Sequence, residues 1–187
     1  MVSLMSLLIP ILVSAVIVFI ASAILHMLIP FHKNDYKKVA REDEFLEAVR
    51  GFDIPAGDYV VPHAEGPAAM KDPAFLEKRV RGPIVIMTVA PGAPPTMAPQ
   101  LTNWFFYCVV VNLFAAYVAS RALAPGADYM DVFQIVGATA FMGYSLALAQ
   151  NWIWFMKNFG ATFRSMIDGL AYAMLTAGVF GWMWPGI

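Results

Sequence analysis

Four long apolar blocks constrain the fold of this chain more than any other feature. The chain has 187 residues, and the blocks run from about Leu4 to Pro30, Leu101 to Ala122, Met130 to Trp154 and Met166 to Trp184. Each is near or above the roughly 20 apolar residues that cross a bilayer as a helix. Because lipid offers no partner to a free backbone amide, such blocks must be helical. The sequence therefore predicts an all-α integral membrane protein with four transmembrane helices.

The composition agrees with a membrane protein and excludes several function classes. Hydrophobic residues make up 60% of the chain and charged residues only 13%, whereas about a quarter of the residues in soluble domains are charged. No basic stripe is present that could neutralise the phosphates of a nucleic acid. The single cysteine, Cys108, lies inside the second block, which excludes an intramolecular disulfide and favours a packing role.

The basic residues predict how the helices are oriented. Nine of the 12 Lys and Arg residues lie between the first and second blocks, Lys157 and Arg164 lie between the third and fourth, and only Arg121 lies elsewhere. Positive charge marks the cytoplasmic side of a membrane protein. We therefore expect a multi-pass protein of a plasma (inner) membrane of bacterial type, with both termini outside. No Lys or Arg precedes the first block, which favours a membrane anchor over a signal peptide.

The chain divides into three regions on this interpretation. Residues 1–30 form the first transmembrane helix, 31–100 form a cytoplasmic insertion, and 101–187 form the second to fourth transmembrane helices. The insertion is expected to be a small mixed α/β segment. Its core looks too small to be complete without the membrane surface or a neighbouring subunit.

Local signals predict the elements of the insertion. A short amphipathic helix is expected at 41–51, and a second helix begins after Asp72 as N-cap with Pro73 in its first position. Gly82 and Pro83 end that second helix. Strands are expected at 59–61 and 84–90.

Small residues recur at every fourth position in the last apolar block. This ridge, which is Gly169, Ala173, Ala177 and Gly181, would let another helix approach closely. The ridge is therefore expected at a helix contact. Polar residues within the blocks, such as Asn112, are expected to form interhelical hydrogen bonds.

Asp168 is the only acidic residue expected to enter a span. An acidic side chain within a membrane is a candidate for a proton relay or an ion site. Arg164 lies one helical turn earlier, so an ion pair between the two at the cytoplasmic interface is the expected arrangement.

The three histidines are weak candidates for metal ligands. His26 and His32 flank the inner end of the first block, and His63 lies in the insertion. Imidazoles together with a carboxylate such as Asp35 or Asp58 can bind zinc or other transition metals. Their spacing matches no established metal motif, so no metal site is expected, and the sequence leaves the identity of any cofactor unknown.

Three function classes remain open. The first is a non-catalytic accessory, assembly or scaffold subunit that packs into a homo- or hetero-oligomeric membrane complex, since no catalytic motif is present. The second is a small oligomeric transporter or channel. The third is a metal- or quinone-linked membrane enzyme subunit. The expected partners are the lipid bilayer and other copies or membrane subunits, and the first class is favoured.

Overall fold

The computed structural model describes residues 1–94 and 96–186 and divides the chain into two compact units. The bundle unit contains Met1–Tyr36 and Thr96–Ile187, and the insertion unit contains Lys37–Pro95. The residues from 31 to 36 and from 96 to 100, which the sequence interpretation placed in the insertion, belong to the bundle unit.

Three segments of the bundle unit are long and apolar enough to cross a membrane, namely Leu4–Met27, Ala98–Ala122 and Tyr129–Ile153. The first contains α1 (Leu8–Met27), the second is α4 (Ala98–Ala122), and the third contains α5 (Tyr129–Tyr144) and α6 (Ala149–Ile153). The chain is thus mostly helical with three candidate membrane spans.

A fourth long helix, α7 (Phe159–Trp182), packs against α5 and α1 in the same bundle. It begins seven residues before the apolar block that predicted it. Asn158 explains this start, because its side chain accepts a hydrogen bond from the backbone N–H of Ala161 and so caps the helix. The first two turns of α7 therefore carry polar side chains, including Arg164.

The third apolar segment is not one continuous α-helix. It is interrupted at Ser145, whose side-chain hydroxyl donates to the carbonyl oxygen of Met166 at 2.8 Å. A Cβ atom built on Gly169 would lie only 2.5 Å from the carbonyl oxygen of Tyr144. The backbones of α5 and α7 therefore meet at the interruption, and a glycine is needed there.

The small-residue ridge of α7 lies along α5. Ala173 and Ala177 are buried, and a Cβ built on Gly137 of α5 would touch Ala177 at 3.2 Å. One built on Gly181 would lie 2.6 Å from the ring of Tyr129. Gly169, Ala177 and Gly181 thus lie against α5 or its ends, and Ala173 belongs to the same buried cluster as Ala140 and Tyr144 of α5.

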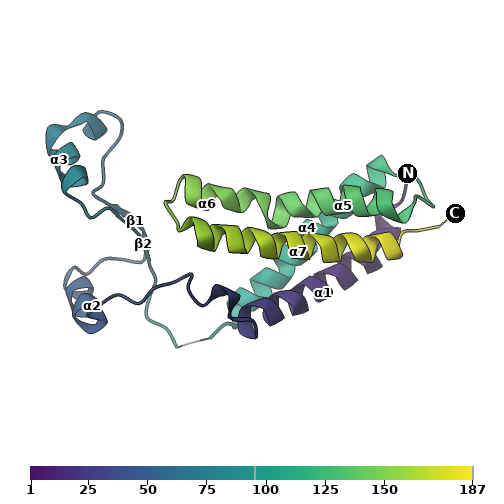
Figure 1. Cartoon of the computed structure of the whole chain (residues 1–187), viewed down its shortest axis with the longest axis horizontal. Helices are drawn as coiled ribbons and strands as arrows, with labels where there is room; N and C mark the ends of the chain where they lie inside the picture. The colour runs from purple at the N-terminus through teal and green to yellow at the C-terminus, as the bar shows by residue number, and fades with distance from the viewer. Residues whose placement is uncertain (95, 187) are drawn as a thin grey trace. The chain divides into compact units, whose positions relative to one another are not determined.

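The bundle core consists of two apolar clusters. One contains Leu7, Val132, Val136 and Phe180, together with small residues of α4. The other contains Val18, Cys108, Tyr144 and Tyr172 with neighbouring residues. Val2 and Leu4 near the start of the chain and Trp184 after α7 lie at the first of these clusters. Trp184 Nε1 donates to the carbonyl of Ala124 at 3.0 Å. In Figure 1 the end of α7 lies close to the start of α5.

The insertion unit contains α2 (Glu42–Gly51), β1 (Gly57–Val61), α3 (Pro73–Arg81) and β2 (Val85–Val89). The strands pair in antiparallel fashion, with Gly57 opposite Val89 and Val61 opposite Val85. The predicted capping of α3 is confirmed, since the Asp72 side chain accepts from Ala74 N and Gly82 follows the helix at a positive φ of 62°. No residue from 37 to 94 is buried.

Candidate functional site

A cluster of five ionisable residues lies at the α6 end of the bundle unit, away from the chain termini. His26 is in the last turn of α1, and His32 ends a short 3-10 turn, Pro30–His32, that follows it. Asp35 comes three residues later. The remaining two residues, Arg164 and Asp168, are one turn apart on α7.

His32 is held between two carboxylates. Its Nε2 lies 2.6 Å from Oδ2 of Asp168, and its Nδ1 lies 2.6 Å from Oδ2 of Asp35. Because an ionised carboxylate only accepts hydrogen bonds, both ring nitrogens carry protons when both aspartates are ionised. His32 is then an imidazolium, and the short distances are typical of charge-assisted hydrogen bonds.

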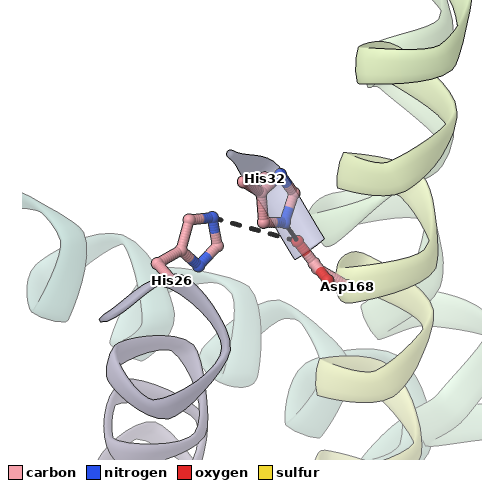
Figure 2. Close-up of side chains that lie close together, drawn as sticks. All are labelled: His26, His32 and Asp168. Carbon is pink, nitrogen blue, oxygen red and sulfur yellow. Dashed lines mark hydrogen bonds and ion pairs between the residues drawn. The ribbon is translucent and has the colours of Figure 1, made fainter. Parts of the chain in front are cut away.

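His26 completes the cluster from the other side. Its ring stacks on that of His32, with centroids 4.6 Å apart and an interplanar angle of 4°. Its Nε2 lies 3.8 Å from the same Asp168 oxygen that His32 contacts (Figure 2). Nδ1 of His26 lies 3.0 Å from the backbone carbonyl of Ser22. A carbonyl oxygen only accepts, so this nitrogen donates and Nε2 of the neutral ring has a free lone pair.

Arg164 and Asp168 were expected to form an ion pair with each other. Instead, each contacts a residue that is distant from it in the sequence. Nε of Arg164 donates to Oδ1 of Asp35 at 2.8 Å, and its Nη2 also bonds that oxygen. Asp168 pairs instead with His32 and His26. Two residues one helical turn apart can form an ion pair. Here the tertiary fold brings other partners close to both residues, and these partners take the place of that pair. Asp168 is only 3% exposed, and a buried ionised carboxylate destabilises the fold unless a close partner of opposite charge compensates it.

Both pKa shifts resolved in the connection after α1 favour the charged forms. Burial alone would lower the pKa of His32, but its hydrogen bonds to Asp35 and Asp168 outweigh burial and raise that pKa above its usual 6.5. Burial alone would raise the pKa of Asp35, but hydrogen bonds from His32 and Arg164 hold it below its usual 3.8. Each shift thus favours the ion pair between the His32 imidazolium and the Asp35 carboxylate.

A cavity of about 480 Å³, lined in part by polar side chains, adjoins the cluster. Its walls include His26, His32 and Asp35. Other polar wall residues are Asn151 of α6, Lys157 and Asn158 just before α7, and Ser165 of α7. This volume is in the range of small-molecule sites. Solvent and small ions can therefore reach the histidines.

The cluster can perform two kinds of chemistry. A proton can pass between Asp35 and Asp168 through the two nitrogens of His32, because imidazole accepts at one nitrogen while it releases at the other. Alternatively, the imidazole nitrogens and the carboxylate can bind a divalent cation, since they are ligands of the kind that zinc and its neighbours prefer.

The other residues named from the sequence do not join the cluster. His63 is exposed in the insertion unit. Cys108 is buried in the bundle core, as its packing role requires. Asn112 makes the expected interhelical hydrogen bond, accepting from Thr176 Oγ1 at 3.0 Å. The pairing of Asp35 with Arg164, 129 residues apart, leaves no local signal that the sequence alone could reveal.

Comparison with protein-family models, curated proteins and solved structures found no match. The function proposed below therefore rests on the residues of this chain.

Proposed function

We propose that the protein is a four-span integral membrane subunit that assembles with other copies of itself through the insertion unit. The fourth span is α7, whose 24 residues make a helix about 36 Å long at 1.5 Å per residue. That length exceeds a hydrocarbon core of about 30 Å. The excess of Lys and Arg in residues 31–100 supports a cytoplasmic insertion unit with both termini outside.

The observation that supports assembly is the exposed apolar surface of the insertion unit. None of its residues from 37 to 94 is buried. Phe45 and Phe52 are 49% and 73% exposed on or beside α2, and Val80 of α3 is 90% exposed. A folded segment without a core of its own needs a partner that covers its apolar side chains.

Charge favours a second copy of the chain as that partner. The α2 sequence has four acidic residues and one arginine, and the α3 sequence has one acidic and three basic residues. An acidic α2 is repelled by an anionic lipid surface, which attracts basic segments. In a two-fold pair, however, α2 of each copy can face α3 of the other, because the contact repeats reciprocally.

Native mass spectrometry of the full chain in detergent tests this proposal. The expected mass is a multiple of 20.6 kDa. Asp43→Lys should shift the population toward monomer, and adding Lys78→Asp should restore the oligomer. Glu65→Lys, in an exposed loop, is the matched control and should have no effect. A monomer in every sample, or a different polypeptide bound in fixed proportion, would contradict self-assembly.

A polar layer inside the bundle favours transport as a second candidate function. Ser14, Asn112 and Thr176 are fully buried on three helices, and each lies between residues of the two apolar clusters. Among the described residues, Ser14 Oγ and Asn112 Nδ2 have no hydrogen-bond partner. Buried polar groups of this kind are commonly satisfied by internal water. Transport ranks second because the apolar cluster around Leu7 and Phe180 closes one end of the bundle.

Proton flux into vesicles that contain the purified protein and a trapped pH dye tests the transport candidate. Transport predicts a flux above that of empty vesicles, and Asn112→Leu should abolish it while Asn103→Leu, near the start of α4, leaves it unchanged. The same rate with and without protein would exclude proton transport.

A further inference from the structure

The two histidines at the end of the bundle present the same nitrogen to the same carboxylate. Nε2 of His32 lies 2.6 Å and Nε2 of His26 lies 3.8 Å from Oδ2 of Asp168. One potential ligand atom from each of the three residues lies within 4.8 Å of the others. Two imidazole nitrogens and a carboxylate oxygen form a ligand set that binds zinc and related divalent metals.

The second nitrogen of each ring is already fixed by an oxygen atom. Nδ1 of His32 bonds the Asp35 carboxylate, and Nδ1 of His26 bonds the backbone carbonyl of Ser22. Metal-binding histidines almost always donate their other N–H to a carboxylate or a carbonyl, which orients the ring and raises its basicity. Arg164 in turn holds Asp35. The cluster thus has the outer hydrogen bonds that a metal site uses, in addition to its inner ligands.

From this arrangement we propose that His26, His32 and Asp168 bind one divalent transition metal ion of the zinc class. The ion takes the place of the proton shared between His32 Nε2 and Asp168, so that proton is released on binding. Asp35 is a positioning residue, because it contacts His32 rather than the ion. Water from the adjoining 480 Å³ cavity fills the remaining coordination positions.

One rearrangement accompanies binding. Lone pairs of imidazole lie in the ring plane, and the two rings are now stacked with parallel planes. The His26 ring must turn toward the ion so that both lone pairs meet it. Its side chain is 51% exposed, whereas those of His32 and Asp168 are 15% and 4% exposed. The ligand with the most exposed side chain, His26, is therefore the one that has room to turn.

Cobalt binding to the full chain in detergent tests the site. After treatment with a chelator, addition of CoCl₂ should produce visible d–d absorption that saturates at one ion per chain, and zinc should displace it. His26→Ala should weaken cobalt binding at least about 10-fold, and Asp35→Asn should weaken it about 10- to 100-fold, as outer-shell changes do. The control is His63→Ala, which should leave the titration unchanged.

The variants also show which outcome overturns the proposal. His26 is half-exposed, so His26→Ala is expected to keep the fold, and unchanged circular dichroism checks this. Absence of a cobalt spectrum in the wild-type protein would refute the site. An unaltered titration in His26→Ala, or an equal loss in His63→Ala, would refute these ligands. The test does not depend on oligomerisation, so it stands or falls separately from the proposed assembly.

Discussion

Nε2 of His32 lies 2.6 Å from Oδ2 of Asp168, although the two residues are 136 positions apart in the chain. This contact joins the connection after α1 to the central part of α7 (Phe159–Trp182). Asp168 is buried, and its closest hydrogen-bond partner, His32, lies outside α7. Loss of this contact should therefore have a large effect on stability.

Replacing His32 with alanine should lower the free energy of unfolding by about 3 kcal/mol or more, because Asp168 then stays buried without its closest partner. Denaturant unfolding in detergent micelles, followed by circular dichroism, measures this change. His63→Ala provides the comparison, since His63 is exposed in the insertion unit. Equal effects of the two substitutions would show that the His32 contact adds no stability.

Stability of the chelator-treated protein should depend on pH on both sides of neutrality. The raised pKa of His32 stabilises the fold below about pH 6.5, and this contribution is lost as the pH rises through the higher pKa of the folded state. The lowered pKa of Asp35 stabilises the fold above about pH 3.8, and this contribution is lost as the pH falls through the lower folded value. The thermal midpoint should therefore be highest between these limits. A midpoint that is independent of pH from about 2 to about 9 would contradict the two shifts.

The positions of several helices, in the bundle unit and in the insertion unit, follow from sequence patterns because each pattern is local. Apolar length marks α1, α4 and the α5–α6 segment. The cap formed by Asp72 and the stop at Gly82 mark α3. The start of α7 was missed because apolar length was the only criterion, although Asn158 is a recognisable N-cap.

Partner choice in the cluster does not follow from such local patterns. The spacing of Arg164 and Asp168 suggested a pair, but Asp35 and His32 reach these residues from a connection more than a hundred positions away. When several donors can reach one carboxylate, the closest and best-aligned donor forms the strongest hydrogen bond. Only the spacing of His32 and Asp35, three residues apart, could have indicated part of the network.

Substituting Gly169 should reveal how tightly α5 and α7 pack. A Cβ at this position would meet the backbone oxygen of Tyr144 at 2.5 Å, which cannot move aside as a flexible side chain can. Gly169→Ala should cost about 1 to 3 kcal/mol, the usual range for overpacking. Gly178→Ala, where the nearest atom is 3.6 Å away, should be neutral or slightly stabilising. Similar unfolding midpoints for both variants would argue against close helix contact at Gly169.

The polar layer predicts opposite effects of removing two hydroxyl groups. Thr176→Val should destabilise by about 1 kcal/mol, because it removes the donor that satisfies Asn112. Ser14→Ala removes a buried hydroxyl that has no partner among the described residues, so it should be neutral or stabilising. Chemical unfolding of both variants compares them directly. A cost for Ser14→Ala equal to that for Thr176→Val would mean that a bound water satisfies Ser14.

Two double-mutant cycles that share Asp168→Asn test the pairing within the cluster most directly. One cycle combines it with His32→Gln and the other with Arg164→Gln, and each measures a coupling free energy from unfolding in detergent. Residues in direct contact couple by about 0.5 to 3 kcal/mol. The structure predicts a coupling in the upper part of this range for Asp168 with His32 and a clearly smaller one for Asp168 with Arg164. A larger coupling to Arg164, or none to His32, would contradict the central claim that His32 is the partner of the buried carboxylate.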